Sequence, residues 1–178
     1  MTESHESWYS NIVKIARVAI RILDRMQMPE NPVIVFDIDN TLLDTRRKLI
    51  QPVFAIYNYA CMLGITIAII TSRIGVRKVI KATQKELSNV GIDNIGFLYF
   101  RNRKNPNCWK FKRSSRANIH DRGYTIVMSV GDKEWDMSGD YTGYGIQVPV
   151  LNELSCEPSL LLSSQIEEGY CLVEQEES

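Results

Sequence analysis

Two aspartates, Asp37 and Asp39, stand one residue apart directly after an apolar segment. That segment, residues 33–36, holds four apolar and mostly β-branched residues without alternation, which predicts a strand buried on both faces. In open α/β sheets, ligands bind outside the carboxyl ends of the strands, which is where this pair falls. Buried carboxylates need a cation or a proton, and a hard ion such as Mg²⁺ prefers oxygen ligands. The pair therefore indicates a metal site, and two aspartates that only cap a turn are the alternative.

Further polar side chains follow other segments that are predicted to be strands. The apolar run 65–70 ends in Thr71, whose hydroxyl can donate a hydrogen bond to a phosphoryl oxygen. Residues 124–130 lead directly into Gly131 and Asp132, and Asp136 lies four residues beyond Asp132. A four-residue spacing places both carboxylates on one side of a helical turn. These side chains are therefore expected to converge with Asp37 at the strand ends.

Apolar runs and amphipathic helix patterns alternate along most of the chain. Strands that alternate with helices through right-handed crossovers form a parallel, doubly wound sheet. We therefore predict an α/β fold, a single Rossmann-like domain with about five parallel strands and helices on both faces. The predicted strands are 33–36, 65–70, 95–100, 124–130 and 144–148, and the predicted helices are 7–27, 52–63, 76–90 and 111–121.

Within one domain we expect three parts. Residues 1–30 are expected to contain an amphipathic helix packed on the core, and residues 31–150 to form the core that carries the site. Residues 151–178 form an acidic extension, in which 154–166 could hold a further helix.

The formal net charge is zero, but basic residues crowd the middle of the chain and acidic residues its end. The basic stretch 101–116 could attract a nucleic acid or a nucleotide. No segment is apolar enough to span a membrane, and no signal peptide is visible, so we expect a cytoplasmic protein without a membrane partner. The cysteines are scattered without a C-x-x-C pair, which predicts no disulfide framework and no structural zinc.

The order of these motifs resembles the haloacid dehalogenase (HAD) superfamily of phosphotransferases. The sequence has D-x-D-x-T at 37–41, a strand ending in Thr71, a lysine in WKFKRSSR, and G-D-x-x-x-D at 131–136. Within the superfamily it looks most like the branch of class B acid phosphatases and plant vegetative storage proteins. That branch has T-G-R, an aromatic-Lys pair followed by Arg, and G-D-x-W-x-D. Here Ser72 replaces the glycine, and Trp135 is displaced by one position.

The resemblance implies a role for each motif. Asp37 would be the nucleophile that forms an aspartyl-phosphate, and Asp39 the acid and base. Thr71 and Lys112 would bind phosphoryl oxygens, with Lys110 as the competing lysine that helix phase does not exclude. Ser72 and Arg73 would bind substrate. Mg²⁺ would be held by the carboxylates of Asp37 and Asp132 and by the backbone carbonyl of Asp39. Asp136 would bind the metal through water or orient Lys112.

The lengths of the connections indicate that no cap domain covers the site. Neither the stretch between Leu42 and the second strand nor that between Thr71 and Lys112 is long enough for one. An open site leaves three hypotheses. The first is a Mg²⁺-dependent phosphomonoesterase acting on nucleotides or other small phosphate esters. The second is a phosphatase on a nucleic-acid end or a phosphoprotein, and the third is a catalytically weak binding or storage-like protein.

Overall fold

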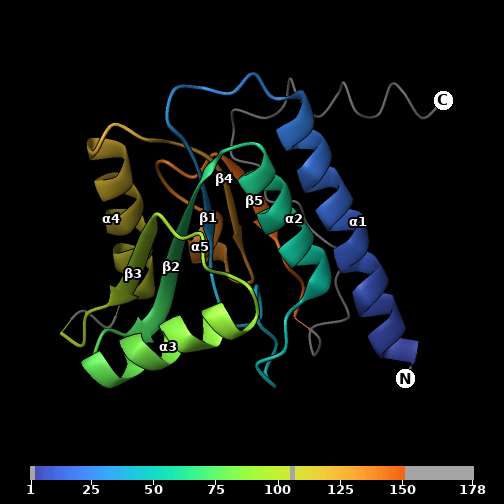
Figure 1. Ribbon diagram of the computed structural model, residues 1–178, viewed down its shortest axis with the longest axis horizontal. Helices are drawn as coiled ribbons and strands as arrows, with labels where there is room; N and C mark the ends of the chain where they lie inside the picture. The colour runs from blue at the N-terminus through green and yellow to red at the C-terminus, as the bar shows by residue number, and fades with distance from the viewer. Residues whose placement is uncertain (1–2, 105–106, 151–178) are drawn as a thin grey trace.

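The computed structural model describes residues 3–104 and 107–150, which form a five-stranded parallel sheet with helices on both faces (Figure 1). The strand order is β3-β2-β1-β4-β5, so the first strand is central and the chain crosses over to each side of it. This arrangement confirms the predicted α/β, Rossmann-like fold. The strands are β1 (Pro32–Phe36), β2 (Thr66–Ile74), β3 (Phe97–Arg101), β4 (Thr125–Gly131) and β5 (Tyr144–Gln147). The helices are α1 (Glu3–Arg25), α2 (Gln51–Met62), α3 (Arg77–Asn89), α4 (Cys108–Asp121) and α5 (Glu134–Met137).

Side chains of β1 alternate between two apolar cores. Ile34 and Phe36 belong to the larger core, which also takes residues from α1 and α2. Val33 and Val35 belong to the smaller core on the opposite face, which is covered by α4. Burying a side chain of this size stabilises the fold by roughly 1.5–3 kcal/mol, so the unbroken apolar run is what holds β1 between two layers.

The first helix is packed on the core, and its buried residues include Trp8 and Ile12. The indole nitrogen of Trp8 donates to the carbonyl of Pro149 at 2.7 Å, which joins α1 to the segment that follows β5. None of the helices in the described part of the chain is long and apolar enough to cross a membrane. The acidic extension at 151–178, with its suggested helix at 154–166, lies outside the described residues.

Two of the differences from the sequence-based expectation affect the site. β2 continues past the apolar run 65–70 to Ile74, because the backbone there still pairs with β3 at Arg101. α4 begins at Cys108 instead of residue 111, because the side chain of Asn107 caps the helix and accepts a hydrogen bond from the backbone of Lys110 at 3.0 Å. Within 3–104 and 107–150 no cap domain interrupts the fold.

Candidate active site

The carboxyl ends of β1 and β4 bring three of the predicted aspartates together. Asp37 directly follows β1, and its backbone N–H donates to the carbonyl of Val130 in β4 at 3.0 Å. Asp132 directly follows β4, and Asp136 lies on α5. Carboxylate oxygens of Asp37, Asp132 and Asp136 lie within 4.8 Å of one another, and all three residues are buried. Thr71 is fully buried in β2, the other strand next to β1.

Helix α4 directs one lysine into this group. The Nζ atom of Lys112 lies 2.6 Å from Oδ1 of Asp37 and 2.6 Å from Oδ1 of Asp136, and it also donates to the backbone carbonyl of Ile70. Only 2 % of the Lys112 side chain is exposed. Lys110, two residues earlier on the same helix, is exposed. The structure therefore places Lys112, and not Lys110, among the carboxylates.

Burial and mutual repulsion dominate the electrostatics of the carboxylates. Burial raises the pKa of Asp37 to about 6, even though Lys112 opposes the shift, and Asp136 raises it further. Burial also raises the pKa values of Asp132 and Asp136. The pKa of Lys112 is raised, because the charges of Asp37 and Asp136 outweigh the effect of its own burial. With all four groups charged, three carboxylates and one ammonium leave a net charge of −2.

This set of side chains fits a hard divalent cation. Its ligands would all be oxygen atoms, which is what Mg²⁺ requires. Among the described residues, Oδ2 of Asp132 is buried and has no hydrogen-bond partner, and Lys133 Nζ is 3.4 Å away. A buried carboxylate oxygen in that state is costly unless a cation or a proton meets it. Oδ1 of Asp136 also lacks a hydrogen bond of good geometry, although it forms an ion pair with Lys112.

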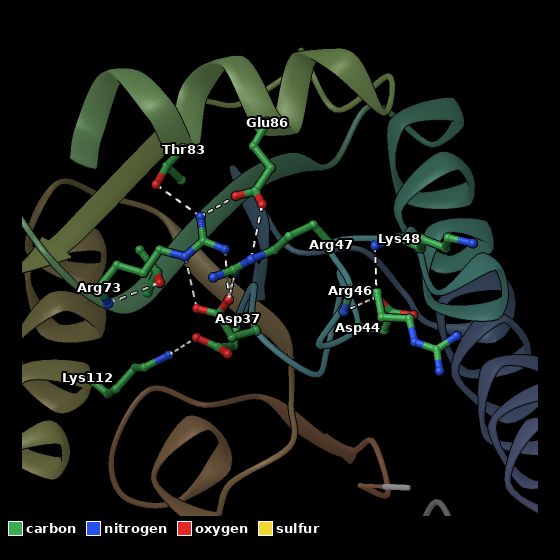
Figure 2. Close-up of polar contacts among 11 residues, drawn as sticks. Asp37, Asp44, Arg46, Arg47, Lys48, Arg73, Thr83, Glu86 and Lys112 are labelled. Atoms are coloured by element: carbon green, nitrogen blue, oxygen red, sulfur yellow. Dashed lines mark hydrogen bonds and ion pairs between the residues drawn. The ribbon is translucent and has the colours of Figure 1, made fainter. Parts of the chain in front are cut away.

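Two arginines, Arg73 and Arg47 (Figure 2), bind the carboxylate of Asp39. Arg73 donates two hydrogen bonds to Asp39, from its Nε to Oδ2 at 2.9 Å and from its Nη2 to Oδ1 at 2.7 Å. Arg47 also donates to Oδ1 of Asp39. Burial alone would raise the pKa of Asp39, but Arg73 and then Arg47 outweigh it and lower the pKa below its usual 3.8.

The remaining guanidinium nitrogen of Arg73 points toward α3. Its Nη1 atom donates to Thr83 Oγ1 at 3.0 Å and to Glu86 Oε2 at 2.5 Å. Arg73 was expected to bind substrate, but here it is engaged by protein groups on both sides. Ser72, the other residue expected at the substrate, is half-buried, and its backbone carbonyl accepts a hydrogen bond from Arg101 Nε at 3.1 Å.

Two residues explain how the segment after β4 takes its shape. At Gly131 an added Cβ would lie 2.2 Å from Cβ of Asp136, so only glycine leaves room for that side chain. Arg116, on α4 and fully buried, donates to the carbonyls of Trp135 at 3.2 Å and of Asp136 at 3.1 Å. Burial lowers the pKa of Arg116 to about 10. Together these contacts fix the backbone that carries Asp136.

Three residues near Asp39 were not predicted from the sequence: Arg47, Thr83 and Glu86. Arg47 lies on a connector that was read as merely basic, and its backbone φ of 62° could not be inferred from its residue type. Thr83 falls on the buried face of α3 and could have been found from helix phase, because Leu87 follows it by four residues. Glu86 is the single acidic residue of α3, whose other charged residues are basic. This difference in charge is the one feature of the sequence that could have pointed to Glu86.

Comparisons with known proteins agree with the fold and identify the family. The family model described as "HAD superfamily, subfamily IIIB (Acid phosphatase)" matches residues 45–153, and the chain belongs to this family. It is therefore a HAD-type phosphatase, a phosphoric monoester hydrolase, as the resemblance of the motifs predicted. The matched region includes Thr71, Lys112, Asp132 and Asp136 and begins after Asp37 and Asp39. Membership favours an enzyme over the catalytically weak binding protein.

Solved structures of class C acid phosphatase from Bacillus anthracis share the fold. One has a TM-score of 0.56 at 16% sequence identity, over 78% of this chain and 67% of the other. A second, with tungstate bound, has a TM-score of 0.55 with the same identity and coverage. At this identity the likeness supports the fold alone. No curated protein matches the chain.

Proposed function

We propose that this phosphatase hydrolyses nucleotides and other small phosphate esters in a Mg²⁺-dependent reaction that passes through an aspartyl-phosphate on Asp37. The observation that carries the proposal is the buried contact between Asp37 and Lys112, with Asp132 and Asp136 beside them. A carboxylate at a strand end, next to a fixed cation, can approach a phosphate dianion that would otherwise repel it. That the protein acts in the cytoplasm stays a prediction from the sequence.

The chemistry has two steps on the same carboxylate. An oxygen of Asp37 attacks phosphorus, the bond to the ester oxygen breaks, and that oxygen takes a proton from Asp39, which must first be protonated and released from Arg73 and Arg47. Water then attacks the phosphorus of the aspartyl-phosphate, Asp39 takes the proton from the water, and inorganic phosphate and the free Asp37 carboxylate are regenerated. Lys112 and Thr71 would bind the phosphoryl oxygens through both steps.

Mg²⁺ would be held by the carboxylates of Asp37 and Asp132 and by the backbone carbonyl of Asp39. Bound there, it would neutralise charge on the nucleophile and the phosphoryl group. The direct ion pair of Asp136 with Lys112 at 2.6 Å supports the hypothesis that Asp136 orients the lysine. A backbone hydrogen bond from Lys133 to Oδ2 of Asp136 at 3.1 Å holds that carboxylate in place.

The test is hydrolysis of p-nitrophenyl phosphate and a panel of nucleoside monophosphates, with Mg²⁺ and with EDTA. Wild type is expected to turn over in Mg²⁺ only, and Asp37→Asn to be inactive. Asp121→Asn, an exposed aspartate at the end of α4, is the matched control and should retain full activity. Turnover that survives in Asp37→Asn would overturn the assignment of the nucleophile.

Two tryptophans support a substrate with an aromatic group. Trp109 stands three residues before Lys112 on α4, and Trp135 lies on α5 between Asp132 and Asp136. Their ring centroids are 6.2 Å apart in an edge-to-face arrangement, and Trp109 is 44% exposed. A nucleobase or an aryl ester could stack on the exposed ring. Nucleoside monophosphates are therefore expected to be better substrates than glycerol phosphate, and Trp109→Ala should reduce that preference.

A phosphorylated nucleic-acid end is the second candidate substrate. Arg103, Lys104, Lys110 and Arg113 are all exposed, and residues 94–120 contain no acidic side chain. Such a stretch attracts a polyanion, and each phosphate contact contributes about 0.7 to the slope of log affinity against log salt for single strands. A 5′-phosphorylated oligonucleotide that is hydrolysed more efficiently than its mononucleotide, with steep salt dependence, would favour this candidate. Equal efficiency would favour the small esters.

A further inference from the structure

Helix α3 carries a row of basic side chains on its exposed face. Successive residues of a helix are about 100° apart around its axis, which places all members of the row within about 100° of one another. The buried residues of this helix, Thr83 and Leu87, lie on the opposite side. The members of this α3 row are Arg77, Lys78, Lys81 and Lys85, and all of them are exposed.

The charges of the α3 row are not neutralised by the protein. Within residues 3–104 and 107–150, no side chain of the row forms an ion pair. The single acidic residue of the helix, Glu86, instead contacts Arg73 and Arg47 with its two carboxylate oxygens. The exposed face of α3 is therefore strongly positive.

This arrangement of charge opposes the stability of the helix itself. Arg77 and Lys81 are four residues apart, as are Lys81 and Lys85, and like charges at that spacing destabilise a helix. Arg77 and Lys78 also stand in the first turn, which holds no acidic residue and where the helix dipole disfavours positive charge. Local arrangements that oppose the fold are expected at functional sites, so the row is better explained by an anion that binds to it.

The α3 row lies beside the candidate active site. α3 begins shortly after the end of β2, the strand that carries Thr71. Thr83 and Glu86 of the same helix are directed toward Arg73, which binds Asp39 (Figure 2). A chain molecule with one end in the site can therefore continue along the exposed face of α3.

A second group of cations adjoins the start of the row. The backbone N–H of Gly75 donates to the carbonyl of Arg101 at 2.9 Å, which holds the start of α3 beside the loop that follows β3. That loop exposes Arg103 and Lys104. Along the helix axis the α3 row is about 12 Å long, at about 1.5 Å per residue. This length exceeds a single phosphate and suits a ligand whose negative charges repeat along a chain.

We propose that the α3 row binds the phosphate backbone of a nucleic-acid strand whose terminal phosphate enters the active site. Stacked nucleotides place a phosphate about every 3.4 Å along a strand, so the row spans about four of them. The exposed side of α3 carries no aromatic or large apolar side chain, which a helix lying on a membrane needs. The inference rests on the proposed function for the chemistry at the terminal phosphate. It adds a binding surface outside the stretch 101–116, which a small ester does not need.

The test measures binding separately from catalysis. A fluorescein-labelled single strand of about ten nucleotides is titrated with the full-length Asp37→Asn protein, and its anisotropy is followed at several salt concentrations. Adding Lys81→Gln and Lys85→Gln is expected to weaken binding by about 10- to 30-fold at roughly 0.1 M salt. The slope of log affinity against log salt should decrease by about 1.4. Lys14→Gln with Arg17→Gln, which removes two exposed cations from α1, is the matched control and should change both quantities far less.

A loss of fold is recognised by thermal unfolding. The α3 double variant should be at least as stable as its parent, because it removes like-charge repulsion. No binding by the parent protein, or equal affinity of the α3 and α1 double variants, would overturn the proposal. Binding to phosphatidylserine vesicles in preference to the strand would also overturn it and would assign this face of α3 to a membrane.

A kinetic measurement connects the bound strand to the active site. In the enzyme with Asp37 intact, the α3 double variant should raise KM for a 5′-phosphorylated strand by about the same factor as it weakens binding. An unchanged KM would overturn the claim that the bound strand reaches the site. The binding assay involves no hydrolysis, so a failure of the proposed phosphatase chemistry would leave the anisotropy result as it stands.

Discussion

Lys112 and Asp37 are 75 positions apart in the chain, and their charged groups meet at 2.6 Å in the buried centre of the site. α4 supplies the lysine and β1 the carboxylate. An ion pair in this environment contributes little net stability, because both groups lose their hydration. The buried Asp37–Lys112 ion pair is therefore better explained by the proposed chemistry than by a contribution to folding.

Removal of the lysine should be costly, since it leaves buried carboxylates without their partner. Lys112→Met is expected to lower the free energy of unfolding by about 3–5 kcal/mol at neutral pH and to abolish hydrolysis of p-nitrophenyl phosphate. Lys110→Met removes the same charge from an exposed position and should change stability by less than about 0.5 kcal/mol. Urea unfolding and initial rates measure both. A Lys110→Met enzyme that loses activity while Lys112→Met keeps it would reverse the assignment.

Gly131→Ala should damage the site through a single added carbon. Its Cβ would lie 2.2 Å from Cβ of Asp136, so Asp136 must move away from Lys112. We expect activity to fall by at least about tenfold, with a loss of stability of about 1–3 kcal/mol. Gly64→Ala is the comparison: its φ of 71° makes alanine strained by roughly 1 kcal/mol, but nothing lies within 4 Å of the new carbon. That variant should be less stable and fully active.

Arg116 should stabilise the proposed metal site by holding the backbone of Asp136. Arg116→Met removes the donors to the partly buried carbonyl of Trp135 and the buried carbonyl of Asp136. The expected cost is about 1–3 kcal/mol in stability, with weaker Mg²⁺ binding because Asp136 loses its support. Arg113→Met, one turn away, breaks only an exposed pair with Asp140 and should cost at most about 1 kcal/mol. Calorimetric titration with Mg²⁺ would show no difference between the two variants if Arg116 served folding alone.

Mg²⁺ affinity should increase with pH. The pKa of Asp37 is raised to about 6, and those of Asp132 and Asp136 are also raised. Below that range the protonated carboxyl groups compete with the metal, and above it they are ionised and bind. Titrations between pH 5 and 8 should therefore show tighter binding at the higher pH, with proton release near pH 6 that is smaller in Asp37→Asn. An affinity independent of pH would mean that these carboxylates are not the ligands.

Much of the site was predictable because parallel strands end at one edge of a sheet. The apolar runs located β1, β2 and β4, so Asp37, Thr71 and Asp132 followed from the chain order alone. The choice of Lys112 over Lys110 needed the true start of α4, which the Asn107 cap sets three residues earlier than the helix pattern indicated. The contact of Asp39 with Arg47 was beyond sequence reasoning, because it depends on the left-handed backbone of Arg47. Arg73 was expected at the site, but as a substrate-binding residue and not as the partner of Asp39.

Trapping the covalent intermediate tests the central claim most directly. The enzyme would be mixed with p-nitrophenyl phosphate and Mg²⁺, quenched in acid and reduced with borohydride, which converts an aspartyl-phosphate to homoserine. Peptide mass spectrometry should then find homoserine at position 37, in a substrate-dependent amount, and not in Asp37→Asn. Homoserine at another aspartate, or none during active turnover under conditions that accumulate the intermediate in other aspartyl-phosphate enzymes, would contradict nucleophilic catalysis by Asp37.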